Sequence, residues 1–320
     1  LRADRVATPE PGESEVLIHV DACGVCHTEL DEIEGRTPPP GLPMTPGHQV
    51  AGVVVREGSA CSLNLEGRRV GVAWIHSACG ECQWCHEGFE NLCPDFRATG
   101  RDAPGGYAEY MLAPEAFVHP LPAEIDDLQV TPLLCAGAVG YRALSLTELK
   151  NGQSLGLTGF GASGHLVLQM ARHLFPASPV FVFARSESER EFALELGADW
   201  AGDTTDIPPS KLDAIIDTTP AWLPVLAALE SLAPAGRLVI NAIRKEAGDR
   251  SRLLDLDYDR HLWREKSVRS VANVTRRDVQ ECLKLAVDIP LVPSVTGFAL
   301  EEANRALVEL KEGKIRGAKV

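Results

Sequence analysis

The 320-residue sequence has no long hydrophobic run and no cluster of basic residues. Its longest apolar stretches, such as residues 50–55, are far shorter than the roughly 20 residues that a membrane-spanning helix needs. No basic segment followed by an apolar one opens the chain, as a secretory signal would. Because 45 acidic residues outnumber 31 basic ones, we expect the surface to repel nucleic acids and anionic lipids. The sequence therefore predicts a cytoplasmic protein with no nucleic-acid or membrane partner.

The length predicts about two domains, and the pattern changes along the chain. The first 120 residues carry short β-rich runs between glycine and proline clusters, which is typical of an irregular β domain with long loops. From residue 153 onward apolar strands alternate with amphipathic helices, as in a parallel sheet covered on both faces. The predicted fold class is α/β: a β-rich N-terminal domain and a doubly wound parallel-sheet domain.

Four expectations concern the ends of the chain. Residues 1–7 have the pattern of a strand, and Leu1 is not an initiator methionine, so we expect the natural chain to begin upstream of it. Near the other end, the pattern predicts a strand over residues 295–299 and a helix over residues 301–312.

Nine cysteines are present, and an odd number in a chain without a secretion signal argues against a disulfide framework. Four of them lie within fifteen residues, at a spacing that indicates a closed tetrahedral zinc site made of thiolates only. An iron–sulfur cluster is the alternative, because four-cysteine runs also hold clusters. The four residues are Cys79, Cys82, Cys85 and Cys93.

A glycine-rich turn follows the predicted strand over residues 154–158 and precedes a predicted helix. In a dinucleotide-binding loop the first glycine makes the tight turn, the second admits the pyrophosphate and the third allows helix and strand to pack closely. The free N–H groups of the helix N-terminus also favour a phosphate. A glycine-rich turn without a ligand is the alternative. The residues expected to contact the cofactor are Gly159, Gly161, Ala162, Ser163 and Gly164.

The end of the next predicted strand bears on the choice of cofactor. A loop that prefers NAD places Asp or Glu there for the ribose hydroxyls, whereas this chain has Arg185 and Ser186. Because arginine binds phosphate through paired, charge-assisted hydrogen bonds, the sequence favours NADP over NAD. The alternative is that Arg185 is a solvated residue stacking on the adenine.

A second possible metal site is dispersed along the chain, in Cys26, His48 and Cys135. Taken singly, each residue has a plain explanation as a buried cysteine or a core histidine. Two cysteines and one histidine together would leave a fourth position open for water or substrate, as in a catalytic zinc site.

Five segments, in this order and at these separations, resemble the zinc-containing alcohol dehydrogenases of the medium-chain dehydrogenase/reductase superfamily. They are Cys26-His27-Thr28, Gly47-His48, the four-cysteine run, Leu134-Cys135-Ala136-Gly137 and the glycine-rich turn. The resemblance implies a GroES-like catalytic domain over residues 1–136, completed by residues 276–320, and a Rossmann domain over residues 137–275, with the active site at their junction.

The same resemblance implies two zinc ions per chain. Cys26, His48 and Cys135 would hold the catalytic ion, and the four-cysteine run the structural one. Zinc would act as a Lewis acid on the oxygen of a small alcohol, aldehyde or ketone while hydride passes to or from the nicotinamide. The family commonly forms homodimers or homotetramers through the nucleotide domain, so we expect a homo-oligomer.

Further site residues follow from the resemblance. Thr28 would pass on the alcohol proton, with a loop-capping role as the alternative. Asp31 stands where many members have a histidine that completes this relay. Its carboxylate would carry the proton to solvent, with a relay that ends at the ribose as the alternative. Gln49 stands where the family commonly has a glutamate. Trp74 would wall the substrate pocket, unless it is an ordinary core residue. Cys23, Cys61 and Cys282 match no ligand position and are expected to be small buried residues.

Three other functions compete with this interpretation. Another enzyme of the superfamily, acting on a polyol or an enone, would keep the same ligands. A non-catalytic relative would have lost Cys26, His48 or Cys135, and all three are present. A thiol redox protein would use Cys23 and Cys26, but no thioredoxin-like context surrounds them.

Overall fold

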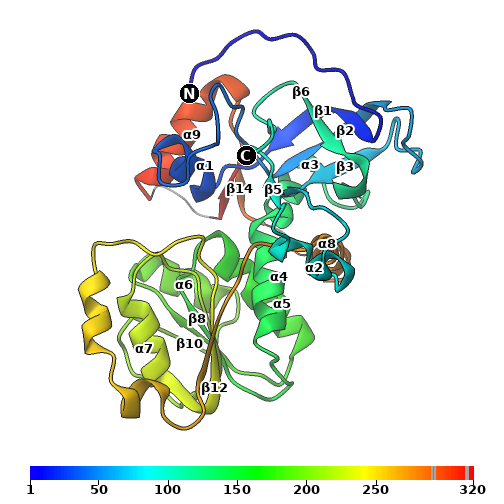
Figure 1. The fold of residues 1–320 in the computed structure, drawn as a ribbon. Helices are drawn as coiled ribbons and strands as arrows, with labels where there is room; N and C mark the ends of the chain where they lie inside the picture. The colour runs from blue at the N-terminus through cyan, green and yellow to red at the C-terminus, as the bar shows by residue number, and fades with distance from the viewer. Residues whose placement is uncertain (290, 292, 314–316) are drawn as a thin grey trace. The chain divides into compact units, whose positions relative to one another are not determined.

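The computed structural model describes residues 1–289, 291, 293–313 and 317–320. The chain divides into two units (Figure 1). Unit 1 comprises Leu1–Ala138 and Asn273–Val320, and unit 2 comprises Val139–Ala272. No helix among the described residues combines the length and the apolar character needed to cross a membrane.

An antiparallel five-stranded sheet with the order β6-β1-β2-β3-β7 forms the centre of unit 1. Alternate residues of these strands, such as Val16 and Ile18 of β1, point into one apolar core, where they meet Val54 and Met111. This alternation is what a sheet with one buried face requires. The strands are β1 (Glu15–Cys23), β2 (Val50–Glu57), β3 (Arg69–Val72), β6 (Tyr110–Pro114) and β7 (Val118–Pro120).

Long connections between these strands carry the short elements of unit 1. Helix α1 (His27–Ile33) lies between β1 and β2 in the chain, and residues 73–109 between β3 and β6 form a lobe. The elements of the lobe and of the segment after it are β4 (Ile75–Ser77), α2 (Gln83–His86), η1 (Glu90–Leu92), β5 (Arg97–Ala98), η2 (Glu115–Phe117), α3 (Asp127–Val130) and η3 (Thr131–Leu134).

The C-terminal segment returns to unit 1. Leu307 and Leu310 of α9 pack against Leu30 of α1 in a small separate core. The predicted strand over 295–299 is limited to a two-residue pairing of β14 with β15, and the predicted final helix begins with a 3₁₀ turn. The elements are α8 (Arg276–Asp288), β14 (Val295–Thr296), η6 (Leu300–Glu302), α9 (Ala303–Lys311) and β15 (Ala318–Lys319).

The predicted strand over residues 1–7 is wrong. This segment forms no regular element, and Val6 is 82% exposed. Charged residues at positions 2, 4 and 5 leave the segment without a continuous apolar face to bury against the sheet, which a strand needs for its stability.

Unit 2 contains the predicted parallel sheet, with six strands in the order β10-β9-β8-β11-β12-β13. The chain builds outward from β8 to β10, then returns past β8 to β11 and continues to β13. At such a reversal of strand order, the carboxyl ends of the strands open a crevice for a ligand. The strands are β8 (Leu155–Thr158), β9 (Val180–Phe183), β10 (Trp200–Gly202), β11 (Leu212–Asp217), β12 (Leu232–Ile240) and β13 (Ser267–Ser270).

Helices cover both faces of this sheet, with α5 and α7 on opposite sides of the strands in Figure 1. Leu229 of α7 packs over Phe181 and Ile215 in the core. Strand β10 was not expected from the sequence. The helical elements are α4 (Ala136–Leu146), which begins in unit 1, and α5 (Ala162–Leu174), α6 (Glu187–Glu195), α7 (Leu223–Ser231), η4 (Arg250–Asp255) and η5 (Tyr258–Leu262).

Candidate active site

Three dispersed ligand candidates come together in unit 1. Cys26 directly precedes α1, His48 precedes β2, and Cys135 follows η3. One ligand atom from each residue lies within 4.8 Å of the other two, and His48 Nε2 is 3.3 Å from Cys135 Sγ. Two sulfurs and one nitrogen are a donor set that zinc prefers, and a tetrahedral ion held by three protein ligands keeps a fourth position for substrate. The donors present therefore fit a catalytic zinc ion.

Close backbone packing places His48 in this cluster. Gly47 has φ +100°, and a Cβ atom at this position would lie 2.5 Å from the ring of Tyr107. A side chain there would push the loop away from Tyr107, so glycine is required at the residue next to the histidine. The His48 side chain is 1% exposed.

Glu29 contacts His48 at Nδ1, the ring nitrogen other than the one that lies near Cys135. The sequence interpretation missed this role. The Oε1 atom of Glu29 lies 2.5 Å from His48 Nδ1 and the Glu29 side chain is fully buried, although the two groups are not aligned as a straight hydrogen bond. The other oxygen, Oε2, accepts a hydrogen bond of 2.8 Å from the backbone N–H of Cys26. A carboxylate on Nδ1 favours the proton there and leaves Nε2 free to bind a metal. The available signal was an acidic residue three positions after Cys26, in the first turn of α1.

A second buried carboxyl group lies one helical turn further along α1. Both carboxyl oxygens of Glu32 are buried without a hydrogen-bond partner among the described residues. Burial, reinforced by the charge of Glu29, raises the pKa of Glu32 to about 8. Burial also raises the pKa of Glu29, while the charge of His48 opposes that shift. Both shifts arise mainly because burial removes the charged carboxylates from water.

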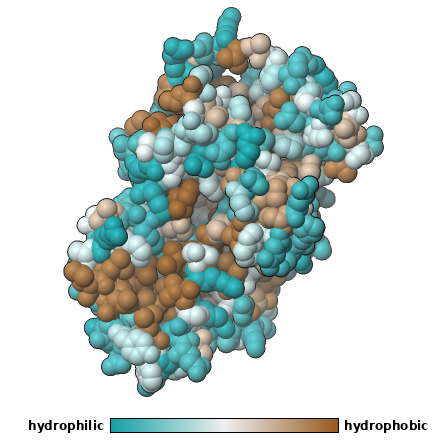
Figure 2. Space-filling model, viewed as in Figure 1, coloured by the Kyte–Doolittle hydropathy of each residue, from teal (hydrophilic) through white to brown (hydrophobic). Residues whose placement is uncertain are grey.

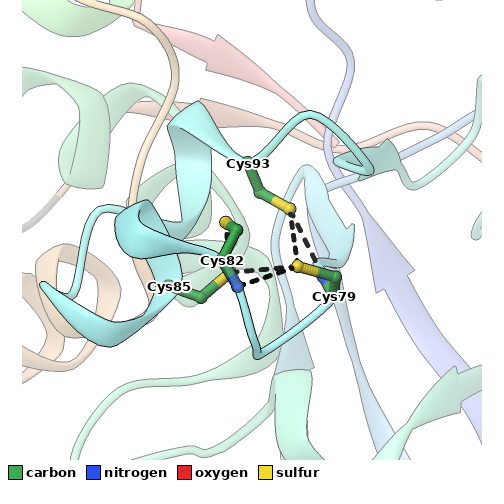
Figure 3. Close-up of side chains that lie close together, drawn as sticks. All are labelled: Cys79, Cys82, Cys85 and Cys93. Atoms are coloured by element: carbon green, nitrogen blue, oxygen red, sulfur yellow. Dashed lines mark hydrogen bonds between the residues drawn. The ribbon is translucent and has the colours of Figure 1, made fainter.

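The four-cysteine run forms a separate cluster on the lobe (Figure 3). The Sγ–Sγ distance is 3.4 Å between Cys79 and Cys93, 3.6 Å between Cys82 and Cys85, and 3.9 Å between Cys79 and Cys85. A tetrahedral ion with zinc–sulfur bonds of about 2.3 Å needs sulfurs about 3.8 Å apart, so these separations fit zinc.

Backbone N–H groups also point at these sulfurs. Cys79 Sγ accepts from the N–H of Cys82 at 3.4 Å, and such backbone hydrogen bonds lower the pKa of the Cys79 thiol to about 7. Hydrogen bonds of this kind stabilise the thiolate form, which is the form that binds metal. With four protein ligands, the cluster leaves no position open for a substrate.

The glycine-rich turn of unit 2 has the geometry of a phosphate cradle. Gly159 has φ +82°, and a Cβ atom on Gly164 would lie 2.7 Å from the carbonyl oxygen of Gly159. A Cβ atom on Gly161 would meet nothing within 4 Å, so the backbone there is open to a ligand. Ala162 and Ser163 are the first residues of α5, whose N-terminus offers free N–H groups. These residues fit the pyrophosphate of a dinucleotide.

Basic and hydroxyl groups gather at the end of β9. Arg185 is exposed, and Ser186 Oγ lies 2.6 Å from Ser188 Oγ at the start of α6. Arg190, which the sequence interpretation missed, donates hydrogen bonds of 2.8 and 2.9 Å to the carbonyl oxygens of Ala184 and Arg185. Its guanidinium thus adds a second positive charge at this strand end.

Of the other predicted residues of unit 1, Thr28 and Trp74 lie near the three-ligand cluster, and Asp31 lies on α1. Thr28 is buried with Oγ1 3.6 Å from Cys26 Sγ. Asp31 is 3% exposed, and its Oδ1 accepts a 2.5 Å hydrogen bond from Arg36 Nε. The ring of Trp74 is centred 6.4 Å from that of His48 and 5.6 Å from that of Phe96.

The cysteines without a ligand role differ in burial. Cys282 is buried, as expected, whereas Cys23 and Cys61 are only partly buried. The Cys61 sulfur lies 3.4 Å from the carbonyl oxygen of Glu15. None of the nine cysteines forms a disulfide.

A first prediction concerns Glu29. Replacing it in the variant Glu29→Gln should weaken zinc binding at Cys26, His48 and Cys135 by about 10- to 100-fold, because the charge that orients His48 is lost. Competition with a chromophoric chelator measures this affinity. Glu32→Gln is the matched control and should bind zinc as the wild type does. Equal weakening in both variants would mean that Glu29 has no specific role in orienting His48.

Comparisons with known proteins agree with this geometry. Residues 12–123 match the alcohol dehydrogenase GroES-like domain and residues 162–288 match the zinc-binding dehydrogenase domain. The chain is 43% identical to the Mycobacterium tuberculosis protein named "Probable alcohol dehydrogenase AdhA", over 99% of this chain and 92% of that protein. It is 34% identical to an alcohol dehydrogenase of Geobacillus stearothermophilus, over 99% and 94% of the two chains.

The fold has a close match among solved structures. A cinnamyl alcohol dehydrogenase from Sorghum bicolor is similar with a TM-score of 0.86 and 28% identity, over 98% of this chain and 91% of that one. The predicted combination of GroES-like and Rossmann folds is thereby confirmed. Together with the relatives above, this match shows that the chain belongs to the zinc-binding alcohol dehydrogenases of the medium-chain dehydrogenase/reductase superfamily.

Proposed function

We propose that this enzyme interconverts alcohols and aldehydes or ketones, with unit 1 as the catalytic domain and unit 2 as the NAD(P)-binding domain. The observation that carries the proposal is the convergence of Cys26, His48 and Cys135, which together offer three metal ligands and leave a fourth position open. Another zinc-dependent reaction of the superfamily, such as polyol oxidation, uses the same ligand set and is the second candidate.

The residues of unit 1 have distinct roles in this reaction. When bound, zinc supplies the Lewis acidity that favours loss of the alcohol proton, and the nicotinamide accepts or supplies the hydride. Cys26, His48 and Cys135 hold the metal, and Glu29 orients His48. The Thr28 hydroxyl can accept a proton and donate its own, so it can pass the alcohol proton onward.

Asp31 is the proposed next acceptor of that proton. Its Oδ1 atom accepts a hydrogen bond from Arg36 Nε, and from this position Asp31 would pass the proton on to solvent. Trp74, stacked at a tilt against Phe96 near His48, is the proposed wall of the substrate pocket.

We propose a second, structural zinc in the four-cysteine lobe, giving two zinc ions per chain. The sulfur separations of 3.4–3.9 Å support this assignment. The proposed preference for NADP is supported by Arg185, Ser186 and Arg190 at the end of β9, where a 2′-phosphate would find two guanidinium groups and a hydroxyl.

We further propose that the enzyme is a homodimer or homotetramer assembled through unit 2. All four residues of β13 are exposed, and among the described residues β13 pairs with β12 alone. An open edge strand is a ready partner for a second copy. Figure 2 shows a broad hydrophobic area on the visible face of unit 2. Large apolar side chains are exposed in the segment that leads to β13, at Leu254, Leu256 and Trp263, and on β13 itself at Val268.

The catalytic assignment predicts the behaviour of Cys135→Ala. This variant should bind one zinc per chain in place of two and lose NAD(P)-linked turnover, because the remaining Cys26 and His48 cannot hold the metal for catalysis. Metal content and initial rates with a panel of aldehydes measure both effects, and circular dichroism checks the fold. Cys61→Ala, which removes a non-ligand thiol, should retain both zinc ions and full activity. Unchanged turnover in Cys135→Ala would refute the catalytic site.

The cofactor assignment predicts a change of preference. The double variant Ala184→Asp/Arg185→Ile should raise the NADH-to-NADPH ratio of kcat/KM by roughly 10- to 150-fold, the equivalent of about 1.5–3 kcal/mol for a charged hydrogen bond. Arg305→Ile on α9 of unit 1 removes an exposed arginine elsewhere and should leave the ratio unchanged. An unaltered ratio in the double variant would show that the end of β9 does not bind the ribose.

The assembly assignment predicts the effect of a charge on β13. Val268→Lys should shift the sedimenting species toward the 34.5 kDa monomer, because a lysine on an edge strand opposes pairing with another copy. Val308→Lys, at a similarly exposed valine of α9, is the matched control and should keep the assembly of the wild type. A monomeric wild type would refute the proposed assembly.

A further inference from the structure

Unit 2 contains a buried ammonium group outside the residues considered so far. The Lys245 side chain is 9% exposed and pairs with Asp217, the fully buried last residue of β11. Its Nζ also donates hydrogen bonds to the carbonyl oxygens of Thr219 at 2.8 Å and Ala221 at 3.0 Å. A lysine has three N–H donors, so all of them are satisfied within the protein.

These contacts fasten two loops together. One loop, residues 218–222, connects β11 to α7, and the other, residues 241–249, connects β12 to η4. Besides Lys245, the backbone N–H of Glu246 donates to the carbonyl oxygen of Pro220 at 2.7 Å. Asp249 Oδ2 accepts from the backbone N–H groups of Trp222 and Leu223 at 2.8 and 2.9 Å.

The two loops lie at the carboxyl ends of β11 and β12, next to the glycine-rich turn. Thr218 Oγ1 donates a 3.0 Å hydrogen bond to the carbonyl oxygen of Thr158, and a Cβ atom on Gly159 would lie 2.7 Å from this hydroxyl. If the adenosine ribose is bound at the end of β9, as in the proposed function, the dinucleotide crosses the glycine-rich turn and continues over β11 and β12. This side of the crevice then receives the nicotinamide half.

One polar side chain in these two loops lacks a hydrogen-bond partner among the described residues. Asn241, the first residue of the 241–249 loop, has a side-chain nitrogen that is buried and makes no hydrogen bond to the described residues. Its backbone N–H is already used, since it donates to the carbonyl oxygen of Asp217 at 2.7 Å. A buried amide donor without a partner costs stability, unless a bound ligand supplies the acceptor.

We propose that the Lys245–Asp217 pair is a positioning device that holds Asn241 in place to donate a hydrogen bond to an oxygen of the nicotinamide half of the cofactor. Lys245 itself does not touch the cofactor, because its three donors are occupied. The inference rests on the proposed function of unit 2. It adds residues that strengthen binding of the whole dinucleotide and leave binding of its adenine half unaffected.

The test compares two ligands on intact protein. One is the reduced dinucleotide that the wild type binds more tightly, and the other is the matching adenine half, which is adenosine 2′,5′-bisphosphate for NADPH or AMP for NADH. Calorimetric titration gives both dissociation constants. Asn241→Ala should weaken dinucleotide binding by about 10-fold, the value of one hydrogen bond, and leave binding of the adenine half unchanged.

The positioning role is tested with the neutral double variant Asp217→Asn/Lys245→Met. Lys245→Met alone leaves an unpaired buried carboxylate and should lower the unfolding temperature, whereas the double variant should recover most of that loss. It should still bind the dinucleotide about 10-fold more weakly and the adenine half as the wild type does. Wild-type binding of the dinucleotide by the double variant, or parallel weakening of both ligands, would overturn the proposal.

A failure of the underlying assignment would look different. If the wild type bound neither dinucleotide nor either adenine half, the cofactor role of unit 2 would be refuted, and this inference with it. Binding of the adenine half with normal affinity, together with no effect of Asn241→Ala on the dinucleotide, would refute only the inference.

Discussion

The electrostatics around His48 constrain the rest of unit 1. Cys26, Cys135, Glu29 and Glu32 bring up to four negative charges into a region where His48 is the central positive group, and burial opposes each of these charges. Such a cluster is costly in a low-dielectric interior unless a cation accompanies it. A doubly charged ion at the three ligands neutralises the thiolates and leaves Glu29 paired with His48. The fold of the β1–β2 connection and the chemistry of the site therefore depend on the same charge.

In unit 2 the main constraint is steric, because the backbone of the glycine-rich turn must come close to the phosphate of the proposed cofactor. Gly159 and Gly164 are needed because a side chain there would collide with neighbouring atoms, and the open space at Gly161 would admit the proposed phosphate. The sheet keeps this turn in place with its inner strands β8 and β9, whose residues are all buried. The buried tether formed by Lys245 lies at the carboxyl edge, where a ligand can use the ordered loops.

The sequence predicted best what is local. The four cysteines of the lobe and the glycine-rich turn lie on short, continuous segments, so their spacing alone indicates their geometry. Cys26, His48 and Cys135 are separated by up to 109 positions, so no local spacing links them, and they were grouped by donor chemistry and by the family resemblance. Glu29 and Arg190 were missed because an acidic or basic residue in an early helical turn is common and shows its partner only after folding. The strand predicted over residues 1–7 is wrong because a local pattern does not show whether a partner strand is available.

The lobe of residues 73–109 has a further consequence. Exposed apolar side chains of its cysteine-rich part include Trp84, Phe89 and Leu92, so the zinc ion proposed for its four sulfurs would take the place of a hydrophobic core there. A structure that depends on a bound ion is ordered only when that ion is supplied. If the proposed zinc is bound there, the lifetime of the protein in the cell would be linked to metal supply, because chains made under zinc starvation would present an open, protease-sensitive loop carrying four oxidisable thiols.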